Sequence, residues 1–398
     1  MISARLKEIP TGVWVLGFVS MLMDISSEMI HALLPVYLVT VLGASMLAVG
    51  VIEGIAEATA MIVKIFSGAL SDWLGRRKLL AVIGYGLAAF TKPIFPLAPD
   101  LGWIVGARFI DRIGKGIRGA PRDALIADLT PAHLHGASYG LRQALDTVGA
   151  FLGPLLAIGL MVFAAASITT VFWIAVIPAF AAFALIAWAV KEPARPVRAG
   201  KASSRLQLSD LKRLPSAFWI VVVVAFVLTL ARFSEAFLVL RAQNVGLSIA
   251  FIPAVMVVMN IAYALAAYPA GAVSDRLGRR GILIAGAALL IVADLVLAYA
   301  GGITLVLVGV VFWGLHMALT QGLLAALIAD TAPANLRGTA FGIFYFTGGI
   351  AMLIASVLAG ALWDAIGPAA TFLAGAGFTV LALVGMAAVL PRVAADRS

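Results

Sequence analysis

The charged residues between positions 106 and 128 are the part of this sequence best suited to chemistry. The segment GARFIDRIGKGIRGAPRDALIAD places three carboxylates among five bases, inside a chain that is otherwise strongly apolar. Carboxylates beside bases can take up protons or exchange ion-pair partners, and the excess bases can bind an anionic group. Apart from Asp128 at its end, the charged residues of the segment are Arg108, Asp111, Arg112, Lys115, Arg118, Arg122 and Asp123.

On a helix, these charged side chains fall within an arc of roughly 140°, at about 100° per residue. The opposite face carries Phe109, Ile113 and Leu125. A charge at the centre of a bilayer costs on the order of 3 kcal/mol on insertion scales. We therefore expect the charged face to meet water or partner charges and not lipid.

Three further segments carry charges at helical spacing: Asp24, Glu28 and His31; Glu53, Glu57 and Lys64; and Arg142 and Asp146. Their acids are expected to neutralise the bases of 106–128 and to form a buried ionic network. A purely structural network is the competing interpretation. Buried ion pairs often add little stability over apolar packing, which favours a functional role. The residues expected to couple protons are Asp24, Glu28, Glu53, Glu57, Asp111, Arg112 and Asp146.

Other polar residues are expected to line a substrate cavity: His31, Lys115, Arg118, Arg142, Arg232, Glu235, Asn260, His316 and Gln321. Two of these assignments have simpler alternatives, because Arg232 and Glu235 are spaced to pair with each other and His316 also fits a packed polar position. Lys92 is expected to extend toward the membrane interface. Asp24, Glu28 and His31 offer metal-ligand atoms, but the neighbouring bases argue against a dication, and we expect no metal site.

The elements that must position these residues are membrane-spanning helices. The 398-residue chain is 63% hydrophobic and 12% charged, whereas a soluble domain is nearer half apolar and a quarter charged. Cysteine is absent. A spanning helix needs about 20 apolar residues. The sequence predicts twelve spans, at about 12–41, 46–70, 79–98, 101–128, 136–163, 168–190, 215–241, 248–273, 281–300, 303–329, 337–362 and 369–391.

The basic residues predict the orientation. Alternate connections hold 18 of the 28 Lys and Arg residues, and the opposite connections hold none. By the positive-inside rule both termini are cytoplasmic, in a membrane of the bacterial inner-membrane type. The net charge of +9 thus mostly reflects the basic residues that set the membrane topology. We expect lipid, protons and a small-molecule substrate as partners, with no nucleic acid, and we expect a monomer.

The chain is predicted to contain two related bundles, at 1–190 and 215–398, joined by a cytoplasmic linker at 191–214. ALIADLTPAHLHGASYG (124–140) aligns with ALIADTAPANLRGTAFG (326–342), with 10 of 17 residues identical at an offset of 202, and GALSDWLGRRKLL (68–80) aligns with GAVSDRLGRRGIL (271–283). At the 202 offset, Asp111 and Arg118 correspond to Trp313 and Thr320. The fold therefore does not require charge there, which favours ion handling in the amino-terminal bundle.

The repeated GALSDWLGRR and GAVSDRLGRR segments resemble the G-x-x-x-D-R-x-G-R-R/K signature of the major facilitator superfamily; the first copy has Trp73 where a basic residue is usual. The resemblance implies an all-α polytopic membrane protein with 12 transmembrane helices in two pseudo-symmetric six-helix bundles. It also implies a transporter driven by the proton gradient, without an enzymatic activity or a cofactor.

At the cytoplasmic side, glycines permit a tight turn and aspartates can pair with arginine or with a helix N-terminus. Such pairs would form a latch that breaks during transport, whereas a basic turn that only sets topology is the simpler alternative. The residues expected in this cytoplasmic gate are Gly68, Asp72, Gly75, Arg76, Arg77, Arg122, Gly271, Asp275, Arg279 and Arg280.

Two further segments resemble signatures of the superfamily. RIGKGIRGA (112–120) is similar to R-x-x-Q-G-x-G-A-A, which implies a proton-coupling role for Arg112, although Lys115 and Arg118 replace the usual residues. Gly140, Gly149, Gly153 and Pro154 are similar to the antiporter signature G-x8-G-x3-G-P, whose closing Gly-Gly is missing. Small residues and Pro permit close packing and a kink. Ordinary small-residue packing is the competing interpretation.

Three functional hypotheses follow. The first is a proton-coupled exporter of a small molecule, working by alternating access between the two halves. The second is proton-linked uptake of a nutrient, an organic anion or a metal chelate. The third is a membrane sensor without transport, which the absence of a long soluble segment disfavours. No P-loop or catalytic triad pattern indicates an enzyme or an ATP-driven pump.

Overall fold

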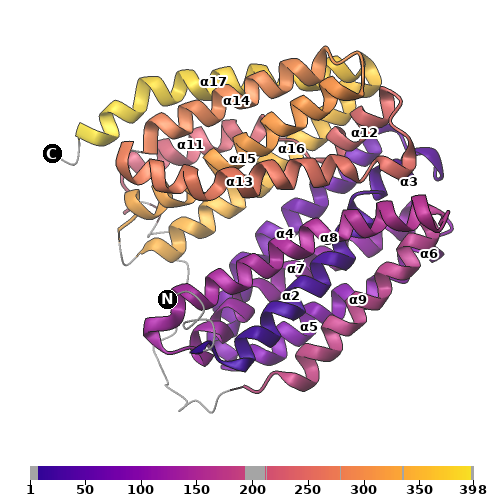
Figure 1. Cartoon of the computed structure of the whole chain (residues 1–398). Helices are drawn as coiled ribbons and strands as arrows, with labels where there is room; N and C mark the ends of the chain where they lie inside the picture. Colours follow the sequence, from indigo (N-terminus) through magenta and orange to yellow (C-terminus); the bar gives the residue numbers. More distant parts are fainter. Residues whose placement is uncertain (1–7, 193–210, 212, 278, 334–335, 396–398) are drawn as a thin grey trace. The chain divides into compact units, whose positions relative to one another are not determined.

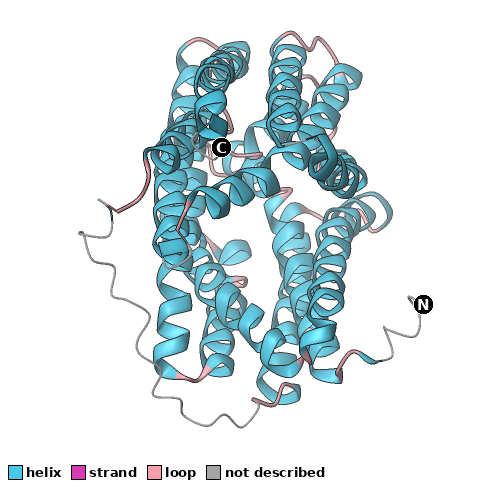
Figure 2. Ribbon diagram, turned by 90° about the vertical axis from the view of Figure 1, so that its left-hand side faces the viewer, coloured by secondary structure: helices cyan, strands magenta, loops and turns pink. Residues whose placement is uncertain are grey.

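The structure, a computed structural model, describes residues 8–192, 211, 213–277, 279–333 and 336–395, without the side chains at 72, 132, 268, 272–280 and 387–395. Within these ranges the chain is helical and contains no strand (Figure 1, Figure 2). The helices are α2 (Thr11–His31), α3 (Leu34–Thr40), α4 (Met46–Leu74), α5 (Arg77–Thr91), α6 (Ile94–Leu97), α7 (Leu101–Leu129), α8 (His135–Phe163), α9 (Ile168–Ala189), α11 (Ser216–Leu230), α12 (Ala236–Asn244), α13 (Ala254–Leu277), α14 (Arg279–Ala298), α15 (Ile303–Thr331), α16 (Arg337–Ala365) and α17 (Pro368–Ala395).

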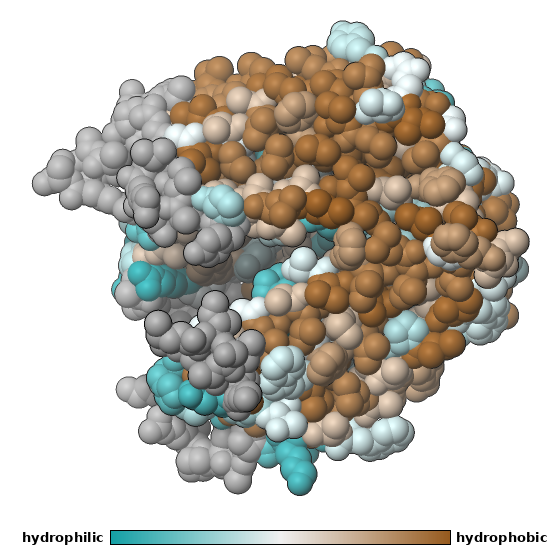
Figure 3. Space-filling view, viewed as in Figure 1, coloured by the Kyte–Doolittle hydropathy of each residue, from teal (hydrophilic) through white to brown (hydrophobic). Residues whose placement is uncertain are grey.

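The surface of these helices is that of a membrane protein. Ten segments of the described chain are long and apolar enough to cross a bilayer. Large apolar side chains point outward, among them Phe163 at 90% exposure and Trp188 at 84%. Hydrophobic residues cover most of the visible face of the helices (Figure 3). An apolar surface of this extent requires lipid, so the chain is an integral multi-pass membrane protein.

The two remaining predicted spans differ from the others. The span predicted at 101–128 is α7, which has the necessary length but carries many charges. The span predicted at 215–241 is broken, because α11 ends at Leu230 and α12 begins at Ala236. Polar contacts replace helical hydrogen bonds in the break: Ser356 Oγ accepts from the Ser234 N–H at 3.1 Å, and Ser234 Oγ accepts from the Ala236 N–H at 3.2 Å. With these two segments, the fold is consistent with the twelve predicted crossings.

Two spans predicted as continuous helices are also interrupted. The first helix ends at His31 and resumes at Leu34, and the third is divided between Thr91 and Ile94. Each interruption lies beside a proline, Pro35 and Pro93 respectively. A proline ring collides with the carbonyl four residues earlier and offers no N–H, so it disfavours a continuous helix.

The chain divides into two compact units, and α4 contributes to both. Residues 38–58 pack with the carboxyl-terminal helices, and the chain from Thr59 packs with the amino-terminal ones. The predicted boundaries at 190 and 215 do not separate these parts of α4. Most of the predicted linker, 193–210 and 212, lies outside the described residues. The domain limits of 1–190, 191–214 and 215–398 remain a prediction.

Equivalent glycines mark the helix crossings of the two sequence repeats. A methyl group on Gly84 of α5 would lie 2.8 Å from the Cβ of Arg118 on α7. A methyl group on Gly286 of α14 would lie 2.6 Å from Cγ2 of Thr320 on α15. Gly286 lies 202 positions after Gly84, and Thr320 lies 202 positions after Arg118. The sequence repeat is therefore also a repeat of side-chain packing.

The first half of α4 is held by α16 within the carboxyl-terminal unit. Asp364 accepts hydrogen bonds from the N–H groups of Met46 at 3.1 Å and Leu47 at 2.8 Å. These donors belong to the first turn of α4, where no helical carbonyl is available to them. A methyl group on Gly360, one turn earlier in α16, would collide with the Met46 carbonyl oxygen. Asp364 thus caps a helix more than three hundred residues away in sequence.

We predict that Asp364→Ala lowers the free energy of unfolding by about 1 kcal/mol, the usual effect of losing an N-terminal cap. The reason is that Met46 and Leu47 lose their acceptor. Thermal unfolding of the detergent-purified protein measures the change. Asp364→Asn keeps one acceptor oxygen and loses the other, so its loss of stability should be smaller than that of Asp364→Ala; an equal loss in both variants would contradict the capping role.

Candidate functional site

The charged face of α7 is buried within the protein, as the helical spacing predicted. Arg108, Asp111 and Arg112 are each 3% exposed, and Arg118 is 6% exposed. Lys115 is exposed. Burial is possible because α7 crosses α5 at very short range: a methyl group on Gly114 would lie 2.6 Å from the Gly84 carbonyl oxygen. Gly114 thus lets α7 approach α5 closely, and this approach positions the charged turns that precede and follow Gly114 in α7.

Asp111 lies in a buried ionic cluster whose main cation was not predicted. Lys92 Nζ donates to Asp111 Oδ1 at 3.0 Å and to Ser27 Oγ at 3.2 Å. Arg112 Nε lies 3.8 Å from Asp111 Oδ2. The prediction that Lys92 reaches the membrane interface is wrong, because its side chain is only 2% exposed. The interruption at Pro93 places Lys92 in a turn between α5 and α6, from which it reaches inward to α7. A lone lysine before a proline in an apolar segment was the available signal.

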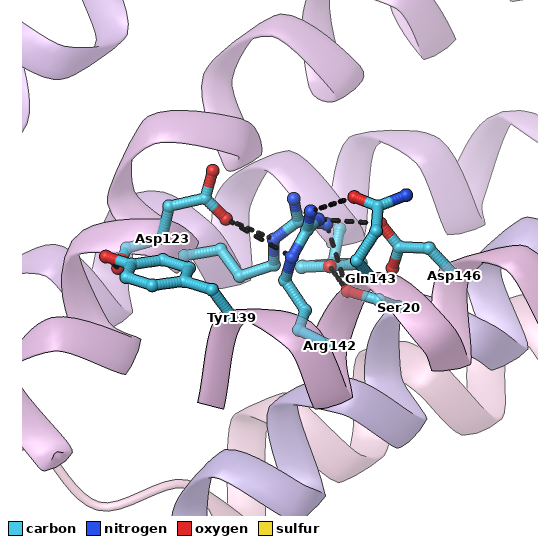
Figure 4. A network of polar contacts seen from close by, with 8 residues as sticks. Ser20, Asp123, Tyr139, Arg142, Gln143 and Asp146 are labelled. Carbon is cyan, nitrogen blue, oxygen red and sulfur yellow. Dashed lines mark hydrogen bonds and ion pairs between the residues drawn. The ribbon is translucent and has the colours of Figure 1, made fainter. Parts of the chain in front are cut away.

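A second polar network joins α7 and α8 (Figure 4). Arg122 donates to Asp123 Oδ1 at 3.1 Å and to Ser20 Oγ of α2 at 2.9 Å. Arg142 donates to Asp146 Oδ2 at 2.6 Å, and its Nε lies 3.9 Å from Asp123 Oδ1. Arg142 thus stands between an acid of its own helix and an acid of α7. Arg122, which we assigned to the cytoplasmic gate, belongs to this network.

The acids of α2 face the same region. Asp24 interacts electrostatically with Arg118, Lys115 and Asp146. Glu28 lies 3.8 Å from Nδ1 of His31 and also interacts with Lys115 and Arg112. The structure therefore brings the predicted α2 acids close to the α7 bases. Their charges neutralise part of the excess positive charge on α7.

Two glycines of α8 fit directly against these acids. A methyl group on Gly149 would lie 2.6 Å from the Met21 carbonyl oxygen and 3.0 Å from Cβ of Asp24. A methyl group on Gly153 would lie 2.8 Å from Cβ of Glu28. Pro154 is buried beside them, within a helix that continues through it. Gly140, by contrast, is exposed and has no atom near its missing Cβ. The α2–α8 contact depends on Gly149 and Gly153.

Glu53 and Glu57 belong to a different part of the fold from the acids of α2. Glu53 is fully buried and Glu57 is half-buried. Both lie on the half of α4 that packs with the carboxyl-terminal unit. Their expected role in proton coupling remains a prediction.

The polar residues predicted in the carboxyl-terminal unit occupy varied positions. His316 is fully buried, and its Nδ1 lies 2.8 Å from the Gly286 carbonyl oxygen. Arg232 and Glu235 lie within the break between α11 and α12 and interact electrostatically. Asn260 and Gln321 are half-buried. Burial makes a packed polar role the simpler account of His316, while the assignment of the set to a substrate cavity remains a prediction.

At the cytoplasmic gate, Arg77 donates to Asp128 Oδ2 at 2.8 Å and to the Ala124 carbonyl oxygen at 2.9 Å. It thereby holds the start of α5 to the end of α7. Gly75 adopts a φ of +65°, which favours glycine in this turn. Gly68 is half-buried, and Arg76 and Gly271 are exposed. The side chains of Asp72, Asp275, Arg279 and Arg280 lie outside the described residues.

The described residues contain no group of three or more His, Asp or Glu side chains that could hold a metal ion. What the amino-terminal unit does contain is a set of carboxylates whose basic partners lie on neighbouring helices. Adding a proton to one of these acids would free its base for another acid. Such an arrangement can convert protonation into a change of helix contacts.

Comparisons with known proteins agree with this architecture. The profile of the Major Facilitator Superfamily matches residues 16–241 and 233–398. The chain is 33% identical to an uncharacterised transporter of this superfamily from Methanocaldococcus jannaschii, over 95% of this chain and 94% of that one. It is 29% identical to the quinolone resistance protein NorA of Staphylococcus aureus over 36% of each chain.

Among solved structures, the nucleoside transporter NupG shares the fold with a TM-score of 0.76, at 14% identity over 96% of this chain and 99% of that one. The profile and the archaeal relative each cover nearly the whole sequence. The chain belongs to the major facilitator superfamily, and it is a multi-pass membrane transport protein and not an enzyme.

Proposed function

We propose that this protein is a proton-coupled secondary transporter that exports a small molecule in exchange for protons, by alternating access. The position of Arg142 between two acids carries the proposal. Its guanidinium is 2.6 Å from Asp146 on α8 and 3.9 Å from Asp123 on α7. A base with two acidic neighbours on different helices can exchange partners when one acid is neutralised.

Asp146 is the acid that we propose takes up the coupled proton. Its carboxylate is 17% exposed, whereas that of Asp123 is 42% exposed. Protonation of Asp146 removes the charge that holds Arg142 to its own helix. Arg142 then turns toward Asp123 and strengthens the ion pair that connects α8 to α7. Asp24, which also interacts with Asp146, transmits the change to α2.

Two observations support export. NorA, a relative over part of the chain, is named for resistance to quinolones. The α8 glycines that resemble the antiporter signature contact α2 at Asp24 and Glu28, so a movement of α8 would alter the surroundings of both acids. We further propose a monomer in the cytoplasmic membrane, with both termini in the cytoplasm, as the basic connections indicate.

Everted membrane vesicles containing the protein test the proposal. A pH gradient is generated by respiration and followed with a fluorescent acridine. The added probes are a fluoroquinolone, ethidium and a quaternary ammonium compound. We expect at least one probe to collapse part of the gradient only when the protein is present. No response to any probe, combined with unchanged drug sensitivity of a deletion strain, would contradict export.

We predict that Asp146→Asn abolishes the probe-induced proton flux, because asparagine imitates the protonated acid and cannot release a proton. Vesicles with this variant should give the response of vesicles lacking the protein. Asp100→Asn is the matched control. Asp100 caps the start of α7, where its side chain accepts from the Gly102 N–H at 2.8 Å, and asparagine caps helices equally well. Equal flux in the two variants would exclude Asp146 as the coupling acid.

A further inference from the structure

The carboxyl-terminal unit contains a buried acid at the position equivalent to Lys92. At the 202 offset of the repeat, Lys92 corresponds to Asp294 on α14, and its partner Asp111 corresponds to Trp313 on α15. The equivalent glycine contacts of Gly84 and Gly286 confirm that this offset holds in the structure. The amino-terminal unit thus has an ion pair where the carboxyl-terminal unit has an acid and an indole.

Asp294 is isolated from solvent and from hydrogen-bond donors. Its side chain is 0% exposed. Among the residues that the structure describes, neither carboxylate oxygen has a hydrogen-bond partner. The acid fits beside Gly375 of α17, where a methyl group would lie 2.7 Å from Asp294 Oδ2 and 3.2 Å from the Ala231 carbonyl oxygen. Two acceptor oxygens therefore lie near the same point, at the break that follows α11.

The charged and titratable side chains that the structure describes around α14 interact with groups other than Asp294. Arg241 of α12 donates to the carbonyl oxygens of Leu297 at 2.9 Å and Ala300 at 2.7 Å, beyond Asp294 at the end of α14. His316 of α15 contacts the Gly286 carbonyl oxygen, two turns before Asp294. Arg232 interacts with Glu235 and with Tyr263 of α13. The described side chains of α17 include no charged residue.

An ionised carboxylate at this position would be strongly disfavoured, because burial removes its hydration and no cation among the described side chains replaces it. It would also repel the nearby Ala231 carbonyl oxygen. A protonated carboxyl group avoids both costs, since it is neutral and has an O–H to donate. The unwound backbone carbonyls of broken helices are also where transporters coordinate coupling ions.

We propose that Asp294 binds a proton in this conformation and is a proton site of the carboxyl-terminal unit, separate from the network around Asp146. The occupancy of this site is independent of transport. The additional step, in which Asp294 releases its proton during the cycle, rests on the proposed function. It requires the break between α11 and α12 to open the acid to water or to a cation.

Infrared spectroscopy of the purified, reconstituted protein tests this proposal without substrate or gradient, so its outcome is separate from that of the flux assay. A protonated carboxylic acid has a carbonyl stretch that a carboxylate lacks. At neutral pH we expect one such band to disappear completely in Asp294→Asn. The matched control Asp364→Asn, which alters an exposed capping carboxylate of the same unit, should leave the band unchanged.

A second variant, Asp294→Glu, keeps a protonated acid and should shift the same band. If the carbonyl bands of protonated acids at neutral pH are identical in the unsubstituted protein and in both variants, the proposal is overturned. A sodium-dependent rise in thermal stability that Asp294→Asn abolishes would also overturn it, because that result would assign the site to a sodium ion bound by an ionised Asp294.

Discussion

Replacement of Gly153 by leucine is expected to abolish transport. A methyl group at this position would already lie 2.8 Å from the Ile25 carbonyl oxygen, 2.8 Å from Cβ of Glu28 and 3.2 Å from the Met29 nitrogen. Most of these atoms are backbone, which cannot turn aside as a long side chain can. Helix α8 would have to move away from α2, at a cost of about 3 kcal/mol by comparison with other overpacked sites.

The displacement would also separate α8 from Glu28, so the loss of transport should exceed the loss of folded protein. Proton flux in everted vesicles, normalised to the amount of folded protein by size-exclusion chromatography, measures this difference. Gly159→Leu is the matched control, because Gly159 lies on the same helix and no atom stands within 4 Å of its missing Cβ. A Gly153→Leu protein with normal flux would show that the α2–α8 contact is not required for transport.

The second large effect is expected from Lys92→Met. This substitution keeps much of the side-chain volume but removes the ammonium group that lies 3.0 Å from Asp111. Breaking a buried ion pair by removing one partner costs about 3–5 kcal/mol, because the other charge remains buried. Arg112 compensates only in part, since its Nε is 3.8 Å from the carboxylate. Thermal unfolding in detergent should therefore show a large decrease in stability.

The double variant Lys92→Met/Asp111→Asn should recover part of this loss, because the isolated carboxylate is then neutral. Recovery is partial because Asp111 also offsets the arginines of α7. Lys115→Met, which removes an exposed lysine from α7, the helix of Asp111, is the control and should change stability little. If Lys92→Met and Lys115→Met behave alike, the buried pair does not stabilise the protein.

Much of the fold followed from periodicity and composition. The buried charged face of α7 was predicted because its residues recur at helical spacing in a segment that lipid could not accept. The proximity of Asp24 and Glu28 to α7 followed from charge balance. The repeat predicted equivalent helix crossings, which Gly84 and Gly286 confirm.

The partners of individual charges could not be predicted in the same way. Lys92 reaches Asp111 only because the helix is interrupted at Pro93, and the direction of a turn is not contained in helical spacing. Arg77 pairs with Asp128 through the packing of α5 on α7. The cap that Asp364 provides for α4 joins residues far apart in sequence, and an aspartate near the end of one helix carries no signal that identifies the other.

The division of α4 between the two units has a consequence for any attempt to study the halves as separate polypeptides. A cut within the connection around 191–214 would leave residues 38–58 on the amino-terminal fragment, while the helices that cover them remained on the other. Gly50 and Gly54 would then lose the contacts that they make with Ser356 and Leu353. A cut in the linker therefore does not coincide with the boundary between the two compact units. The two fragments must associate before all of their helices are covered.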